Sequence, residues 1–280
     1  KGAIIEFDNV DFEFTTRYDS VVLKQTKAKF LISERKVIGE GGTFDWTSTG
    51  LEADVKGSFR QYVFPTNKIL IKAEGFNLSY DSKLEKPVEG VFMFASTKHS
   101  RPNNARYPRF MSYNADVNLK DLGDDVKYTG GFSLNGPKVY STCVSMAKSK
   151  IEVFKEGHRK FVTKAIYFEL GDSIITANPS SVTIYFGGGF AYTPAVQNDS
   201  TINDSISRVA IDPVQAGPPT DSIYHPSVRL KYHIQKEKLS VYKNKSKYKQ
   251  TPFVDTYHAI DIDVDAVYWN VTDSLMKFTV

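Results

Sequence analysis

Apolar and polar residues alternate with a period of two along most of this 280-residue chain. That period is typical of β-strands that have one face in a core and the other in water. Val228, Leu230 and Tyr232, for example, alternate with Arg229 and Lys231. The same alternation recurs at residues 10–14, 76–80, 182–186 and 260–265. No stretch of ten residues has a convincing helical period, so the pattern predicts an all-β fold.

Turn-forming residues separate these runs. Glycine, proline, asparagine and aspartate mark residues 39–42, 54–57, 65–67, 130–131, 135–137, 156–157 and 187–189. Short strands joined by such turns, without intervening helices, predict antiparallel hairpins rather than parallel βαβ units. We expect about 15 to 20 strands, arranged as an elongated sheet, a sandwich or a folded groove of successive hairpins.

Residues 193–226 stand apart as one long polar insertion, because they are rich in proline and poor in aromatic residues. They predict a long loop between two strands. A second break in the strand pattern, at residues 98–104, divides the chain into an N-terminal β region (1–98) and a C-terminal β region (99–280). The two regions can also form one continuous domain.

Composition narrows the class of protein. Hydrophobic residues make up 41% and aromatic residues 13% of the chain, which is typical of a globular fold. The lone Cys143 excludes an intrachain disulfide and a cysteine-ligated metal site. A net charge of +4 is too small to predict a nucleic-acid partner, and no apolar run is long enough for a transmembrane helix. The chain begins at Lys1, so we expect either a removed leader or a piece of a longer protein.

Two short motifs have a catalytic character. Gly171, Asp172 and Ser173, followed later by Asp255 and His258, resemble the outer motifs of a lipase/esterase family with a serine nucleophile. That family requires long helices and an intermediate Gly-x-Asn-Asp motif, and the chain lacks both. We therefore expect a protein that is not an enzyme, with no catalytic residues.

Metal ligation has little support in the sequence. Asp261, Asp263 and Asp265 resemble the opening of a calcium loop, but the glycine and the closing glutamate of that loop are missing. Their alternation with apolar residues predicts the solvent face of a strand. The histidines have no metal-ligand spacing: His99, His158, His225, His233 and His258. We expect neither a metal nor a cofactor.

Basic residues gather in one segment between residues 229 and 249. Two interpretations are open: lysines that protect an exposed strand from edge-to-edge association, or a patch for an anionic glycan, a lipid headgroup or an acidic partner. The residues of this anionic-partner patch are Arg229, Lys231, Lys236, Lys238, Lys243, Lys245, Lys247 and Lys249.

A series of segments resembles one group of known proteins. The segments are residues 41–46, 86–92, 107–110, 128–134, 221–226, 251–253 and 266–269. In this order they resemble a stretch of very large, β-rich, mostly uncharacterised cell-envelope proteins of the Bacteroidota. The resemblance implies an exported, outer-membrane-associated protein of the periplasm or cell surface, and it supplies no catalytic residue.

Asp-Ser pairs followed by a small or aliphatic residue point to the same setting. Exported Bacteroidota proteins are commonly O-glycosylated at such pairs, and the chain has more of them than its composition would produce. The candidate glycosylation sites are Ser20, Ser173, Ser200, Ser205, Ser222 and Ser274.

The leading interpretation is a non-enzymatic exported β scaffold or interaction segment of a large cell-envelope protein or complex. Its partners would be other envelope proteins or the remaining parts of its own longer chain. One alternative is a β groove that shields lipid in a bridge-like envelope transporter. Another is a carbohydrate-binding β-sandwich, although Trp46 and Trp269 lie among apolar neighbours and favour core packing over a sugar platform.

Overall fold

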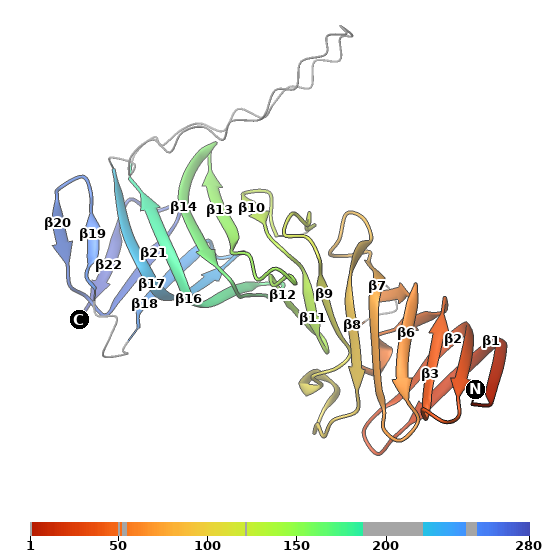
Figure 1. Ribbon diagram of the computed structural model, residues 1–280. Helices are drawn as coiled ribbons and strands as arrows, with labels where there is room; N and C mark the ends of the chain where they lie inside the picture. The colour runs from red at the N-terminus through yellow and green to blue at the C-terminus, as the bar shows by residue number, and fades with distance from the viewer. Residues whose placement is uncertain (1, 50, 52–54, 121, 187–220, 245–250) are drawn as a thin grey trace, which may run out of the picture.

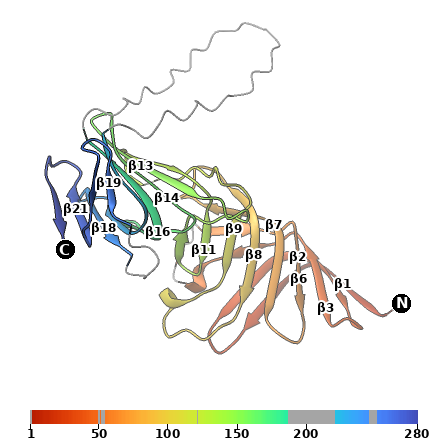
Figure 2. The ribbon, with the colours of Figure 1, turned by 60° about the vertical axis from the view of Figure 1, so that its left-hand side comes forward.

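The computed structural model describes residues 2–49, 51, 55–120, 122–186, 221–244 and 251–280. They form an elongated all-β molecule in which the strands follow one another from the N-terminal to the C-terminal end (Figure 1). Figure 2 shows the same succession from a second direction, from β1 at one end to β21 at the other. In these residues no helix is long and apolar enough to cross a membrane.

Within the described residues the chain has 22 strands and two short 3-10 turns. The elements are β1 (Ile4–Thr15), β2 (Ser20–Leu31), β3 (Lys36–Glu40), β4 (Thr43–Asp45), η1 (Thr47–Thr49), β5 (Val55–Ser58), β6 (Gln61–Pro65), β7 (Leu70–Tyr80), β8 (Val88–Ala95), η2 (Pro102–Asn104), β9 (Arg109–Ser112), β10 (Val126–Thr129), β11 (Ser133–Asn135), β12 (Lys138–Tyr140), β13 (Ser149–Lys155), β14 (His158–Ala165), β15 (Phe168–Leu170), β16 (Ile174–Tyr185), β17 (Ser222–His233), β18 (Lys238–Lys243), β19 (Phe253–Asp255), β20 (Ile260–Ile262), β21 (Ala266–Asn270) and β22 (Met276–Thr279).

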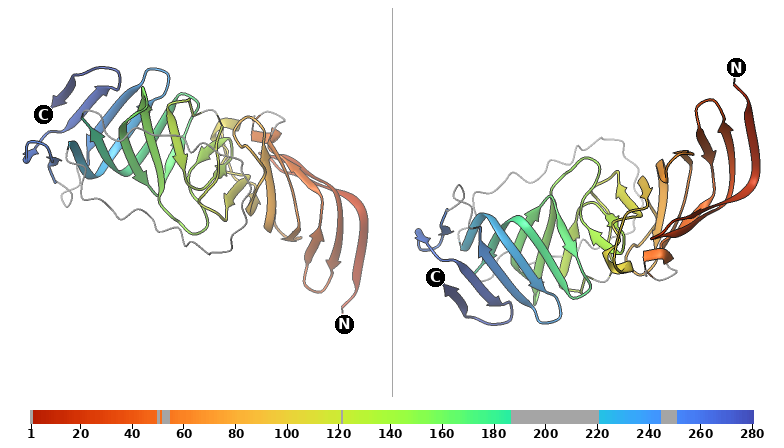
Figure 3. Two further views of the ribbon diagram at one scale, coloured as in Figure 1. Left: turned by 90° about the horizontal axis from the view of Figure 1, so that it is seen from above. Right: turned by 90° about the horizontal axis from the view of Figure 1, so that it is seen from below.

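All named strands belong to one antiparallel sheet with the order of a meander. Consecutive short strands act as the two halves of one bent strand, because both halves pair with the same neighbours. For example, β3 and β4 both pair with β2, while β6 and β5 respectively continue the sheet to β7. In the C-terminal part, β14 and β15 pair with the two ends of β16, and β18 and β19 pair with the two ends of β17. Figure 3 shows this succession of strands from above and below.

The bends lie near the middle of the long strands. Several coincide with residues of positive φ or with proline, which interrupt a regular ladder. Bend residues include Asn9 (φ 53°), Gln25 (φ 54°), Gly41 (φ 67°), Gly42 (φ 90°), Gly75 (φ 64°), Pro179 and Pro226. Because neighbouring strands bend at matching positions, the sheet folds over on itself and its apolar face is enclosed.

Side chains replace ladder hydrogen bonds that the bends remove. The backbone N–H of Gly75 donates to the Tyr113 hydroxyl (2.9 Å), and that of Phe132 donates to Ser112 Oγ (2.9 Å). In the same way the N–H of Phe168 donates to Ser141 Oγ (2.9 Å). Ser112 and Ser141 are fully buried, and a buried polar group must find a hydrogen-bond partner. The bends therefore explain why hydroxyl groups lie inside an otherwise apolar core.

One continuous apolar cluster fills the fold from Val21 to Val271. Side chains from the two halves of the folded sheet meet inside it. The rings of Phe14 on β1 and Phe64 on β6 lie 5.1 Å apart between centroids, edge to face. Trp46 and Trp269 are 0% and 5% exposed, which confirms that both tryptophans pack in the core.

The all-β, antiparallel prediction is confirmed, with two corrections. The strand count exceeds the expected range because the bends divide long strands in two. Part of the predicted polar loop is wrong, since Ser222 begins β17, and Ile223 and His225 pair with β16. Residues 187–220 lie outside the described residues, and the strands that precede and follow them are neighbours in the sheet.

Candidate functional site

A buried polar cluster begins in the turn between β1 and β2. Thr16 N donates to the carbonyl of Asp19 (2.8 Å), and Thr16 Oγ1 accepts the N–H groups of Tyr18 (3.1 Å) and Asp19 (2.9 Å). This turn holds the Asp19 carboxylate in a fixed direction, and the Asp19 side chain is only 6% exposed. A buried carboxylate needs polar partners, so the residues that face it are informative.

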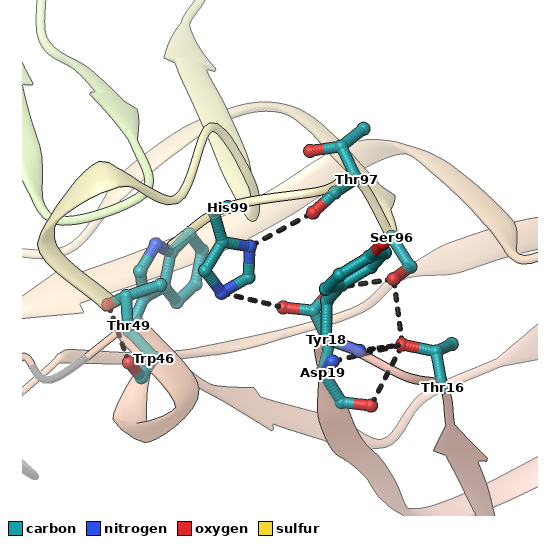
Figure 4. A network of polar contacts seen from close by, with 8 residues as sticks. All are labelled: Thr16, Tyr18, Asp19, Trp46, Thr49, Ser96, Thr97 and His99. Carbon is teal, nitrogen blue, oxygen red and sulfur yellow. Dashed lines mark hydrogen bonds and ion pairs between the residues drawn. The ribbon is translucent and has the colours of Figure 1, made fainter. Parts of the chain in front are cut away.

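Those partners come from the chain that follows β8, about 80 residues away in sequence. Ser96 Oγ donates to Asp19 Oδ2 at 2.6 Å and lies 2.8 Å from Thr16 Oγ1. His99 Nε2 lies 3.8 Å from Asp19 Oδ1, and its side chain is 10% exposed. Figure 4 shows the His99 ring between Asp19 on one side and Trp46 and Thr49 on the other. The cluster thus joins the β1–β2 turn to the connection between β8 and β9.

The hydrogen-bond directions limit the chemistry of this cluster. His99 Nδ1 lies 2.9 Å from the carbonyl oxygen of Thr97, so that nitrogen must carry a proton to donate. The other ring nitrogen faces a carboxylate, and the ion pair forms only when it is protonated too. Ser96 Oγ donates to Asp19 Oδ2, and Figure 4 marks no hydrogen bond between Ser96 and His99. A nucleophilic serine needs a base at its hydroxyl. Here the contacts of Asp19, Ser96 and His99 join two segments of the chain, and we call this cluster the polar latch.

The catalytic motifs considered in the sequence lie far apart in the fold. The carbonyl of Ser173 accepts from Ile234 N (3.0 Å), just beyond the end of β17. His258 follows β19, which pairs with the first residues of β17. Ser173 and His258 therefore sit at opposite ends of that 12-residue strand. They do not meet.

Asp255 and His258 form a local turn instead of a catalytic pair. His258 Nδ1 lies 2.8 Å from Asp255 Oδ2, and Asp255 Oδ1 accepts the N–H groups of Tyr257 and His258. Burial acts to raise the pKa of Asp255, but the hydrogen bonds from His258 and from the two N–H groups outweigh it and lower the pKa. These hydrogen bonds stabilise the turn after β19.

The residues of the basic patch lie in different electrostatic environments. Lys231, Lys236 and Lys238 surround His233, whose pKa is lowered by partial desolvation and by these three positive charges. Lys243 instead pairs with Asp263. The other members are Arg229, whose guanidinium lies 4.6 Å from the centre of the Tyr242 ring, and Lys245, Lys247 and Lys249, which lie outside the described residues.

His225 is fully buried at the bend of β17, and its ring links β17 to the residues that precede β19. Ser227 N donates to His225 Nδ1 (3.0 Å), so Nε2 carries the proton and donates to the carbonyl of Thr251 (2.9 Å). Desolvation lowers the pKa of His225 and outweighs the opposing effect of the Thr251 hydrogen bond. The neutral ring therefore has a structural role, because its hydrogen bonds join β17 to Thr251.

The candidate glycosylation serines differ in accessibility. Ser20, Ser173 and Ser274 are exposed, whereas Ser222 is 1% exposed and its hydroxyl contacts Thr256. Ser200 and Ser205 lie outside the described residues. An O-glycan needs an accessible hydroxyl, so the folded chain offers Ser20, Ser173 and Ser274 and shields Ser222.

In the described part of the chain, acidic and histidine side chains do not cluster as metal ligands would. Asp263 pairs with Lys243, and Asp261 is exposed beside it on β20. Among the residues that the structure describes, no three His, Cys, Asp or Glu side chains are grouped to hold a metal ion.

Comparison with protein families, with curated proteins and with solved structures finds no match to this chain. The latch of Asp19, Ser96 and His99 was not foreseen from the sequence. In the sequence, Asp19 is only the aspartate of the Asp-Ser pair at Ser20, and His99 is only one of several scattered histidines. Their contact depends on the folding of the sheet, for which no local motif exists.

Proposed function

We propose that this chain is a non-enzymatic β scaffold, exported to the cell envelope, that serves as an interaction segment of a larger envelope protein or complex. The observation that carries the proposal is a folded sheet with a filled interior and an open first strand. A filled interior suits a structural role, and an open strand offers backbone hydrogen bonds to a partner.

The interior supports a scaffold over a groove that shields lipid. A lipid groove requires apolar side chains that line an open concave face. Here the enclosed rings contact one another directly: Phe44 and Phe92 lie 4.9 Å apart between centroids, and Phe161 and Tyr232 lie 5.1 Å apart. Phe44 is 2% exposed, and Phe92 and Phe161 are fully buried. Protein side chains thus occupy the space that an acyl chain would need.

Strand β1 supplies the interaction surface. Within the described residues, β1 pairs with β2 alone and leaves its other edge free. Its inward residues Phe7, Phe12 and Phe14 pack against the core but remain only half-buried. A further strand on this edge would cover them, as β-augmentation does in other complexes.

The charge of β1 indicates what kind of strand fits. Glu6 and Asp8 pair with Lys29 and Lys27 of β2, yet their side chains remain 70% and 80% exposed. Asp11 and Glu13 extend the acidic row along the strand. Opposite charges on adjacent strands are favourable and like charges are not. We therefore assign to this edge an antiparallel strand with an apolar inner face and a basic outer face.

Export to the envelope rests on the sequence. The repeated Asp-Ser pairs and the resemblance to β-rich Bacteroidota envelope proteins both support it. Three of the Asp-Ser serines are exposed in the described residues, as modification would require.

Hydrogen–deuterium exchange tests the edge directly. The chain is compared in isolation and in the assembly purified from the native envelope. We expect the amides of residues 4–15 to exchange more slowly in the assembly, while β16, paired on both sides, is protected in both samples. Equal exchange of residues 4–15 in the two samples would contradict the proposal.

A further inference from the structure

An elongated cleft lies on the outer face of the C-terminal half of the sheet. It is open to solvent, has a volume of about 530 Å³ and is lined by Tyr167, Glu169, Thr176, Asn178, Arg229, Lys231 and Tyr242. Volumes of this order are typical of small-molecule sites. The scaffold proposal does not use this cleft.

Strand register places the polar side chains of the cleft in one row. Glu169 pairs with Thr176, and Thr176 pairs with Lys231. Directly paired residues share one face of a sheet. The next residues along, Ala177 and Leu230, are 4% and 1% exposed and point into the core, so the row faces solvent.

Tyrosine rings flank the row on both sides. Tyr167 is 41% exposed and stacks on Tyr140, with centroids 4.5 Å apart and ring planes at 29°. On the other side, Tyr242 lies edge to face with Tyr268. Tyr167 precedes β15 and Tyr242 belongs to β18, so three strand intervals separate them, about 14 Å at ~4.8 Å per interval. That span suits an extended ligand of linked rings better than a single small ion.

The charged side chains of the cleft narrow the class of ligand that it can bind. Glu169 is already paired with Lys138 at 3.0 Å. Within the described residues, no ion pair joins Arg229 or Lys231 to a carboxylate. Two cations therefore face the cleft with their charge available. A guanidinium binds a carboxylate through paired hydrogen bonds, while Thr176 and Asn178 can bind hydroxyl groups.

We propose that this cleft binds a short anionic oligosaccharide whose sugar rings carry carboxylates, as in polymers of uronic acids. The exposed face of Tyr167 packs on a sugar ring, as aromatic side chains do on flat apolar surfaces. Arg229 and Lys231 take the carboxylates of neighbouring sugars. The Glu169 carboxylate accepts from sugar hydroxyls and disfavours densely charged ligands such as polyphosphates.

Titration calorimetry on the full chain tests the site with defined tetrasaccharides. The probes are oligomers of galacturonate, of mannuronate and of unsulfated chondroitin, with cellotetraose as the neutral probe. We expect saturable binding of at least one uronate oligomer, weakened by added NaCl, and markedly weaker binding of cellotetraose. Failure of all three uronate oligomers to bind, or equal binding of cellotetraose, would overturn the proposal.

Matched variants locate the binding. Arg229→Ala and Tyr167→Ala should each weaken binding roughly tenfold, as loss of a charged hydrogen bond or a ring platform does. Tyr167→Phe, which keeps the ring, should bind nearly as well as the unaltered chain. The controls are Arg101→Ala and Tyr224→Ala, which change exposed residues outside the cleft. If these controls weaken binding as much as Arg229→Ala, the cleft is not the site.

Discussion

Phe161 on β14 and Tyr232 on β17 meet edge to face inside the folded sheet, with ring centroids 5.1 Å apart and planes at 71°. Phe161 pairs across its own half of the sheet with Ile184, while Tyr232 pairs with Ile175 in the other half of β16. The contact therefore joins the two halves of the bent sheet. It is the packing on which a filled interior depends.

Removal of the Phe161 ring should leave a cavity between the two halves. We expect Phe161→Ala to lower the free energy of unfolding by about 3–5 kcal/mol, the usual cost for a buried phenylalanine. Urea denaturation followed by fluorescence measures this change. Tyr224→Ala is the control, since Tyr224 is 40% exposed, and it should cost only about 1 kcal/mol, the loss of strand propensity. Similar losses for the two variants would mean that the interior is not packed as described.

The polar latch joins the β1–β2 turn to the chain after β8, so its removal should also lower the free energy of unfolding. Ser96→Ala removes the donor to Asp19 Oδ2 and leaves a buried carboxylate oxygen with fewer partners. We expect a loss of about 1–3 kcal/mol in the free energy of unfolding. Ser20→Ala changes an exposed serine next to the same aspartate and should be nearly neutral. A neutral Ser96→Ala would show that the latch does not hold these segments together.

The bend between β3 and β4 allows a test with two adjacent glycines. A Cβ at Gly41 (φ 67°) would meet nothing within 4 Å, so Gly41→Ala should cost only backbone strain, about 1 kcal/mol. A Cβ at Gly42 (φ 90°) would lie 2.9 Å from the carbonyl oxygen of Lys24. Gly42→Ala should therefore be clearly the more destabilising of the two in urea denaturation. The reverse order would contradict the bend geometry.

The buried ring of His225 makes stability depend on pH. Its pKa is lower in the folded chain than its usual 6.5, so the unfolded chain binds the proton more readily. The stabilising contribution is complete above about pH 6.5 and is lost as the pH falls below it. His233, whose pKa is also lowered, acts in the same direction.

Urea midpoints at about pH 7.5 and about pH 5.5 measure this effect. The unaltered chain should lose stability on acidification, and His225→Gln, though less stable at the higher pH, should lose less. His233→Gln should remove only the smaller share of the more exposed ring. If His225→Gln keeps the full pH dependence, His225 is not its source.

Glycosylation predicts a pattern set by burial. Chain purified from its native host should have an intact mass above that of the unmodified sequence, and peptide mapping should find glycans at Ser20, Ser173 or Ser274. Ser222 should be unmodified because it is 1% exposed within β17. An unmodified mass from the native host would remove this support for export.

Alternation predicted the strands well where a strand is covered on one face. Val228, Leu230 and Tyr232 were expected on one face, and all three are buried in β17. At the edge of the sheet the same pattern was less informative. Ile260 was expected to face a core, but it is 50% exposed because β20 pairs only with β19 among the described strands.

The bends could not be predicted from local sequence. The adjacent glycines at 41–42 and those at 130–131 predict turns between strands. They lie instead within bent strands, between β3 and β4 and between β10 and β11. Gly41 and Gly42 have positive φ, while Gly130 and Gly131 leave room for the close approach of Ser149 and Cys143. Glycine suits a turn or a bend for either reason, and only the pairing partners distinguish the two. The contact between Asp19 and His99 joins residues 80 apart in the chain, so local sequence could not predict it either.

The most direct test of the central claim is native mass spectrometry of the chain purified from its own envelope. We predict a protein complex of fixed stoichiometry, without stoichiometric phospholipid, that is lost in the variant Phe7→Lys, because a lysine pointing inward on β1 blocks the edge. A single chain that carries phospholipid at fixed stoichiometry and has no protein partner would contradict the scaffold and favour the lipid groove.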